Sequence, residues 1–250
     1  MQNHLVTLLT LCFLTFSANS QTIIPEWFET TPDSPPGIMY AVGYSGKYQN
    51  PSLARKAALY QALTNMAKQT QSHLIFEVED LADGIFRILN PTFDLSYEAL
   101  ALLEIESNYS ALDSSISADG YFVLIGYPQT SHKISANDKE WGARPDWTGN
   151  LPSSKEHYYG VGIVSNYSSW VRAWRDADEY ARFDLGKNIE IAARSTHTIQ
   201  RDSRNVIESK IIRQSYDLTL RNSIVVSHWY DKNSDTYYSL CRQPRSVKPD

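Results

Sequence analysis

The arrangement of hydrophobic and polar positions in this chain occurs twice. Each time, a short apolar strand that contains a glycine precedes a helix with an alanine at every fourth position. The matching residues are Gly43 and Gly162 in the strands, then Ala54, Ala58 and Ala62 in the first helix and Ala173, Ala177 and Ala181 in the second. The two members of each pair are 119 residues apart. An offset shared by so many positions predicts an internal repeat.

The spacing of the apolar residues predicts the same element order, β-α-β-α-β-β, in both copies. The first copy has a strand over 38–44, the alanine helix, a strand with Leu74, Phe76 and Val78 on one face, a helix over 92–103 and a hairpin that ends with 121–125. The second copy has a strand from 159, the alanine helix, a strand with Ile189, Ile191 and Ala193, a helix over 206–221, and a hairpin over 223–242 with a turn at 231–235. This order predicts an α+β fold of two tandem repeats, each a small sheet covered on one face by helices.

The alanine stripes indicate a close contact between helix and sheet. Alanines four residues apart lie on one side of a helix and have almost no side chain to hold it away from its neighbour. Gly43 and Gly162 then fit where the backbones of strand and helix approach each other. The glycines lack the spacing of a phosphate-binding loop, so we expect a packing role for them.

Polar residues mark the ends of the alanine helices. Asn50, with a proline after it, is the expected N-cap of the first helix, and Ser168 or Ser169 is the expected N-cap of the second. Lys68 and Lys187 are expected in the last turns, where a positive charge suits the carbonyl end of the helix dipole.

The chain divides into four predicted segments: a signal peptide over 1–20, a first repeat domain over 21–128, a polar linker over 129–144 and a second repeat domain over 145–250. The apolar run from Leu5 to Phe16 is too short to cross a bilayer as a helix, and small residues precede the predicted cleavage after Ser20. Because Leu11 before Cys12 departs from a lipobox, we expect a soluble exported product rather than a chain lipidated at Cys12. A buried N-terminal helix is the alternative.

Each repeat opens with a proline, an acidic residue and a tryptophan, at Trp27 and at Trp147. We expect these indoles to cover one end of each core, with an exposed, ligand-stacking tryptophan as the alternative.

The composition, 42% hydrophobic and 20% charged, is that of a chain with a packed core. A net charge of −5 and a pI near 5.7 argue against a general affinity for nucleic acid or anionic lipid. Cys241 is the one cysteine left after cleavage, which excludes an intrachain disulfide. It lies in a predicted strand, where a small semi-buried residue is a better interpretation than a nucleophile or an intermolecular bridge.

These features resemble the Lpp-twenty lipoprotein family of bacterial envelopes, a domain type that also occurs in flagellar envelope proteins. The resemblance depends on the Pro-x-Trp opening, the Tyr-x-x-Gly strand, the alanine helix and the closing hairpin with Trp229 and Tyr230. The departures are the missing lipobox and the first hairpin, which has no Trp-Tyr-Asp. The resemblance implies a non-enzymatic protein of the periplasm or outer membrane, with envelope proteins or flagellar basal components as partners. Peripheral membrane association and an oligomer are compatible with it.

No catalytic, metal-binding or cofactor-binding residues are predicted. The histidines are scattered, and no His-x-x-x-His or serine-elbow motif is present. Two acidic clusters, Glu77, Glu79 and Asp80 and then Asp176, Asp178 and Glu179, are interpreted as solvated faces. Arginines, among them Arg182, alternate with the second cluster, as expected of an exposed helix with ion pairs.

Three function classes remain. The leading one is a non-enzymatic envelope interaction or assembly module. The second is a glycan or peptidoglycan binder, which needs a groove lined by Trp27, Trp170 or Trp229. The third is a secreted hydrolase built from distant carboxylates or histidines.

Overall fold

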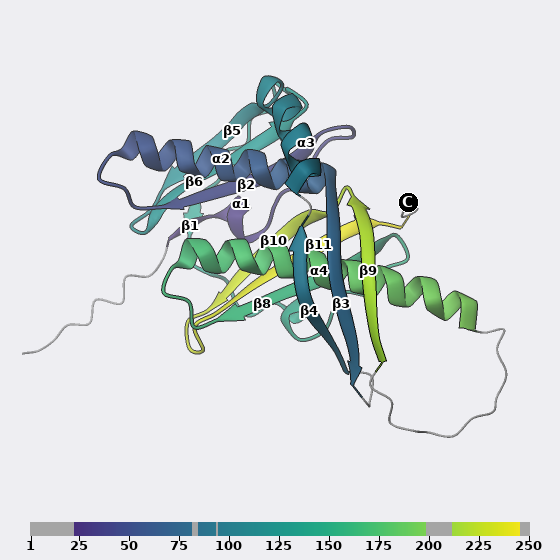
Figure 1. The fold of residues 1–250 in the computed structure, drawn as a ribbon. Coiled ribbons are helices and arrows are strands. Elements are labelled where there is room, and N and C mark those ends of the chain that lie inside the picture. Colours follow the sequence, from purple (N-terminus) through teal and green to yellow (C-terminus); the bar gives the residue numbers. More distant parts are fainter. Residues whose placement is uncertain (1–22, 82–84, 94, 199–211, 246–250) are drawn as a thin grey trace, which may run out of the picture.

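A computed structural model describes residues 23–81, 85–93, 95–198 and 212–245. It has an α+β fold, as the sequence predicts, with two main helices and three-stranded antiparallel sheets (Figure 1). The predicted signal peptide, the cleavage after Ser20 and Cys12 lie outside the described residues. Among the described helices, none is long and apolar enough to cross a membrane.

The first unit is a helix on a three-stranded sheet. Its strands lie in the order β2 (Met39–Gly46), β6 (Gly120–Tyr127) and β5 (Ser110–Ile116). Helix α2 (Pro51–Thr70) packs on β2 and β6, and α3 (Leu95–Ser107) packs on α2 (Figure 1).

The second unit has the same plan. Its strands lie in the order β8 (His157–Ser165), β11 (Thr236–Pro244) and β10 (Ile224–Asp231), and helix α4 (Trp170–Thr198) packs on β8 and β11. The two units thus share their strand order and the position of their main helix. That they arose as a tandem repeat stays a prediction.

The predicted close contact between helix and sheet is confirmed in both units. All six alanines of the two stripes are buried, and five of them are completely buried: Ala58, Ala62, Ala173, Ala177 and Ala181. A Cβ atom added to Gly43 would lie 2.1 Å from the Ala58 carbonyl oxygen, and one added to Gly162 would lie 1.8 Å from the Ala177 carbonyl oxygen. Both glycines are therefore required by the approach of the two backbones.

A third sheet joins the two halves of the chain. It has the order β4 (Ile85–Phe93), β3 (Gln71–Leu81) and β9 (Ile212–Arg221), all antiparallel. Strand β3 follows α2 directly, whereas β9 belongs to the second half, and the two lie side by side in Figure 1. The units are therefore connected by a shared sheet as well as by the chain between them.

Two element predictions for the second half are wrong. The strand predicted at Ile189, Ile191 and Ala193 is part of α4, which continues to Thr198. Lys187 therefore lies inside the helix, where it pairs with Asp184, while Lys68 does lie in the last turn of α2. The helix predicted over 206–221 is β9 from Ile212 onward, and 199–211 lies outside the described residues.

The segment predicted as a helix over 206–221 forms a strand from Ile212 onward because it pairs with β3. In β9, Tyr216, Leu218 and Leu220 alternate with polar residues and are buried, and the strand is hydrogen-bonded to β3 along its length. Alternation with period two fits a strand. The offset of 119 residues places this segment on the equivalent of α3, so the halves differ between their main helices and their closing hairpins.

The segment over 129–144, predicted as a linker, packs between the units. Its β7 (Asp138–Lys139) pairs with β1 (Ile24–Pro25), and α1 (Glu26–Glu29) follows β1. Trp141 lies against Phe28 and Trp174, with ring centroids 6.0 and 5.4 Å away. The segment thus connects the units but is not a free connector. A 3₁₀ turn, η1 (Asp146–Thr148), leads into the second unit.

The predicted helix caps are confirmed. The Asn50 side chain accepts a hydrogen bond from the Ser52 amide, at 2.9 Å, and the Ser169 hydroxyl accepts one from the Arg172 amide, at 3.5 Å. The two closing hairpins, β5–β6 and β10–β11, are also formed where the sequence predicts them.

Replacing Ala58 with leucine should destabilise the fold. The added methylenes have no space between α2 and β2, and overpacking typically costs about 1–3 kcal/mol. The free energy of unfolding from urea denaturation measures this cost. Ala57→Leu is the matched control, because Ala57 is half-buried on the neighbouring side of the helix. Equal stabilities of the two variants would contradict the close contact.

Candidate functional site

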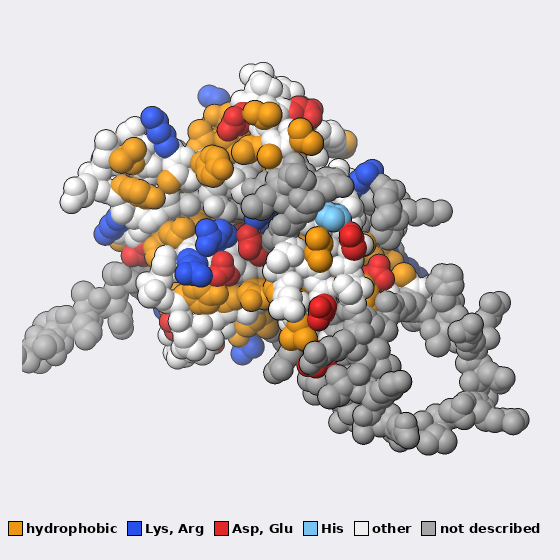
Figure 2. All heavy atoms as spheres, in the orientation of Figure 1, with side chains coloured by type: hydrophobic (Ala, Val, Ile, Leu, Met, Phe, Trp, Pro, Cys, Tyr) orange, Lys and Arg blue, Asp and Glu red, His pale blue; other side chains and the backbone are white. Residues whose placement is uncertain are grey.

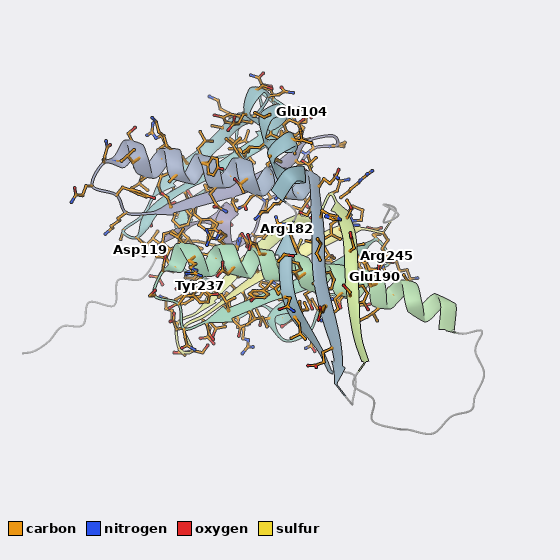
Figure 3. All side chains as sticks on the ribbon, viewed as in Figure 1. Glu104, Asp119, Arg182, Glu190, Tyr237 and Arg245 are labelled. Atoms are coloured by element: carbon orange, nitrogen blue, oxygen red, sulfur yellow. The ribbon has the colours of Figure 1, made fainter. Side chains whose placement is uncertain are left out.

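An aromatic pocket of about 170 Å³ lies where the two units meet. Its lining comes from both units and from the segments between them: Ile24, Asp119, Phe122, Trp141, Trp170, Trp174, Tyr230 and Tyr237. Figure 3 shows Asp119 and Tyr237 close to the N-terminal end of α4. We refer to these eight residues as the aromatic pocket.

The aromatic pocket has a buried floor and a half-buried rim. Ile24, Phe122 and Trp174 are at most 2% exposed and form the floor. Trp141, Trp170 and Tyr230 are half-buried and form the rim.

The rings of the aromatic pocket face it from several directions. The Trp174 and Tyr237 rings are 5.0 Å apart and inclined at 87°, and the Trp141 and Tyr230 rings are 6.5 Å apart and inclined at 59°. Trp170 stacks on Phe122, at 5.6 Å and 27°. The rings therefore surround the space instead of forming one flat platform.

Asp119 is the acidic residue of the pocket. Its Oδ2 atom is buried and has no hydrogen-bond partner, and the same is true of Nε1 of Trp141. The turn between β5 and β6 holds Asp119 in place, since the Ser117 hydroxyl accepts hydrogen bonds from the amides of Asp119 and Gly120, at 3.1 and 3.3 Å. A buried polar atom without a partner is uncommon in folded proteins and calls for an explanation.

Gly120 lets Trp170 reach the pocket. A Cβ atom on Gly120 would lie 1.9 Å from the Ser45 carbonyl oxygen and 2.8 Å from the Trp170 ring. A larger residue would force this edge of the first sheet away from the start of α4.

The two tyrosines of the pocket stay uncharged. The Tyr230 hydroxyl donates to Asp235, at 2.9 Å, and burial together with this bond raises the pKa of Tyr230 well above its usual value. Burial also raises the pKa of Tyr237, and the nearby charges of Asp235 and Asp119 add to the effect. Both phenols are therefore neutral at physiological pH.

Beneath the pocket lies a fully buried polar cluster centred on Asp178. One carboxylate oxygen, Oδ1, is 2.8 Å from Nε2 of His228 and accepts from the Ser239 hydroxyl at 2.7 Å. The other oxygen accepts from the Tyr44 hydroxyl at 3.2 Å. His228 also reaches the Phe28 carbonyl oxygen through Nδ1, at 2.8 Å. Because both ring nitrogens face acceptors, the geometry is that of an imidazolium paired with a carboxylate.

Arg182 adds a second positive charge to this cluster. It is completely buried near the middle of α4 (Figure 3), and its Nη1 donates to the Asp178 carbonyl oxygen at 3.2 Å. Its Nε and Nη2 atoms have no hydrogen-bond partner. Burial opposes ionisation of Asp178, but the charges and hydrogen bonds of His228, Arg182 and Ser239 hold the pKa of Asp178 below its usual value.

The Ser239, His228 and Asp178 side chains do not form a catalytic triad. In such a triad the serine hydroxyl donates to histidine, whereas Ser239 here donates to the same carboxylate oxygen as His228. All three residues are at most 2% exposed, so no substrate reaches them.

The structure corrects the interpretation of the second acidic cluster. Asp178 and Arg182 are buried, not on a solvated face, and Asp178 bonds to His228 and Ser239 of its own unit and to Tyr44 of the first. Asp176 does lie near the surface, with Tyr167 and the two exposed arginines Arg172 and Arg175. In the first cluster, Glu79 is also buried.

Two of the three tryptophans considered for a glycan-binding groove are buried in the core. Trp27 and Trp229 are 2% and 7% exposed, and their indole nitrogens donate to Asp113 and to the Gly142 carbonyl oxygen. Trp27 covers the core as predicted. Of the three candidates for the groove, Trp170 lines the aromatic pocket. No sequence motif marks Trp141, Trp174 or Asp119 as pocket residues, because their neighbours in the pocket come from distant segments.

Other features of the described surface are less enclosed. A hollow of about 390 Å³ beside the start of α2 is bordered by the exposed side chains of Lys47, Tyr48 and Arg55. Exposed hydrophobic residues gather over α2 and α3: Leu53, Tyr60, Leu100 and Leu103 (Figure 2). Among the described residues, no group of three or more His, Cys, Asp or Glu side chains could hold a metal ion.

Comparison with known proteins found no match: no family model, no curated protein and no solved structure is similar to this chain. The resemblance to the Lpp-twenty family therefore stays a prediction from the sequence.

Replacing Asp178 with asparagine should strongly destabilise the fold. The change leaves the buried His228 and Arg182 without a negative charge, and breaking a buried pair in this way costs about 3–5 kcal/mol. Asp176→Asn is the control on the same helix, where an exposed pair contributes up to about 1 kcal/mol. Urea denaturation at neutral pH measures both.

The same comparison has a pH dependence. Because the pKa of Asp178 is lowered in the folded state, its stabilisation is complete above the unfolded pKa of about 3.9 and is lost as the pH falls through the folded value. The difference between wild type and Asp178→Asn should therefore shrink below about pH 4. A difference that does not change with acid would contradict the ion pair.

The Cys241 thiol should be unreactive in the folded protein. It is completely buried in β11, and burial raises its pKa to about 12, so the thiolate is scarce at neutral pH. Alkylation by iodoacetamide, followed by mass spectrometry, should occur in denaturant and be absent in buffer. Rapid labelling of the native chain would show that the strand opens.

Proposed function

We propose that this chain is an exported, non-enzymatic binding protein of the bacterial envelope that holds other envelope components through the aromatic pocket. The observation that carries the proposal is the pocket itself. It brings together six large rings from four parts of the chain, and two of its lining residues, Asp119 and Trp141, each carry a buried polar atom without a hydrogen-bond partner. Concave, largely apolar sites with a few polar groups are typical of ligand-binding sites.

The chemistry of the described residues supports binding over catalysis. Among the side chains that could act as acid, base or nucleophile, His228, Asp178 and Cys241 are buried and engaged in packing or hydrogen bonds. In the aromatic pocket, Asp119 has no neighbouring nucleophile or second carboxylate in the lining. A hydrolase would need such a group within hydrogen-bond reach of the substrate.

The cellular location and the class of partner are proposed from the sequence. The predicted signal peptide and the resemblance to the Lpp-twenty family support a place in the periplasm or at the outer membrane, and the flagellar association depends on the resemblance alone. The exposed hydrophobic residues on α2 and α3 provide a further surface for contact with a protein partner.

Glycan binding is the second candidate. The rim rings Trp141 and Trp170 offer faces on which a sugar could stack, and Asp119 offers an acceptor for a hydroxyl group.

Crosslinking in native cells tests the proposal. Wild-type protein should capture envelope proteins, and Trp141→Leu should lose them while it still unfolds cooperatively near the wild-type temperature. Tyr230→Leu is a second pocket variant if Trp141→Leu does not fold. Trp147→Leu is the matched control, since Trp147 is half-buried and outside the pocket.

Two results would overturn the proposal. One is capture that the pocket variants leave unchanged. The other is hydrolysis of a peptide, ester, glycoside or phosphate substrate by purified protein, with loss of turnover in Asp119→Asn.

A further inference from the structure

We propose that the aromatic pocket binds an alkylammonium group, which the surrounding rings and the Asp119 carboxylate recognise together. The inference rests on the proposed function, because it names the ligand class of the same pocket.

The rings provide the first part of the recognition. The face of an aromatic ring carries partial negative charge and attracts a cation within about 6 Å of its centre, with tryptophan the strongest. Three tryptophans and two tyrosines line the pocket. They surround it at inclinations up to 87°, so a cation inside has ring faces and edges on several sides.

Asp119 provides the second part. Its Oδ2 is buried without a hydrogen-bond partner, although a buried carboxylate oxygen is normally paired. None of the eight residues that line the pocket is Lys, Arg or His, so the lining contains no positive charge to balance it. A cationic ligand supplies the missing charge.

The size of the pocket limits the ligand. Sites for drug-sized molecules have volumes of about 300–1,000 Å³, and this cavity has about 170 Å³. It therefore takes a compact group, such as a trimethylammonium headgroup or the end of a lysine side chain, and not a larger molecule as a whole.

The same geometry disfavours a sugar. A sugar ring stacks on one flat aromatic face and needs several hydrogen-bond partners for its hydroxyl groups. In this lining, the buried polar atoms without a partner are Oδ2 of Asp119 and Nε1 of Trp141, and the Tyr230 hydroxyl already donates to Asp235.

A titration with choline and its neutral isostere, 3,3-dimethylbutanol, tests the ligand class. The two molecules have the same shape, so their difference reports the positive charge. Calorimetry on the full exported chain should show choline binding at least about tenfold tighter, the size of effect expected of a desolvated cation on aromatic rings. Quenching of tryptophan fluorescence gives an independent measurement.

Variants locate the site. Asp119→Asn should weaken choline binding about tenfold and leave the isostere unchanged. Asp146→Asn is the matched control, because Asp146 is an exposed carboxylate outside the pocket, and it should bind choline like wild type. Asp119→Asn keeps the shape of the side chain, so we expect this variant to fold and its affinity for choline to be measurable.

The source of the ammonium group is found with peptides. A short peptide with one trimethyllysine that binds tighter than free choline assigns the pocket to a protein side chain. Equal or weaker binding of the peptide assigns it to a free small molecule. Both outcomes support an alkylammonium ligand.

Equal affinity for choline and its isostere, or no binding of choline and the peptide, would overturn the inference. Binding of N-acetylglucosamine in their place would overturn the ligand class but keep the pocket as a binding site. If neither binds and Trp141→Leu still loses envelope partners in cells, the inference fails and the proposed function stands. If choline binds as expected and Trp141→Leu keeps those partners, the proposed function fails and the ligand class stands.

Discussion

The buried carboxylate of Asp178 connects more parts of this protein than any other side chain described above. It is carried by α4 and bonded to His228 on β10, Ser239 on β11 and Tyr44 on β2, and His228 in turn holds the carbonyl of Phe28 in α1. Charged groups are costly to bury, so these partners must all be in place when the carboxylate leaves water. The ion pair and its hydrogen bonds thereby help to fix the relative position of the two units, together with the sheet that they share.

The aromatic pocket depends on this arrangement. Trp174 lies one turn before Asp178 and contacts the His228 ring edge to face, with centroids 5.0 Å apart. Phe28 stacks on the same imidazole, at 4.4 Å and 8°, and its ring lies 5.4 Å from that of Trp174. A rigid polar cluster therefore supports the floor of the pocket, while the half-buried rim residues, Trp141 and Tyr230, face the opening. Rings held in place by their packing lose little freedom when a ligand arrives.

The sequence predicts local structure well and long-range structure poorly. The alanine stripe, the two caps and the closing hairpins depend on residues close together in the chain, and each is confirmed. The pairing of β3 with β9 depends on residues more than a hundred positions apart, and periodicity carries no information about such partners. Asp178 shows the same limit, because its charge suggests an exposed position, whereas its partners His228, Ser239 and Tyr44 come from distant strands. Asp119 and Trp141 become pocket residues through the fold alone.

The shared sheet has a consequence for synthesis of the chain. Strand β3 is made early, but its partner β9 emerges from the ribosome only with the last strands. Until then, one edge of β3 has no partner from β9, and exposed strand edges are sites of aggregation. Contacts between distant segments also slow folding. This late completion is compatible with the proposed export, in which the chain would cross a membrane before it folds, since the first half cannot close into its final form ahead of the second.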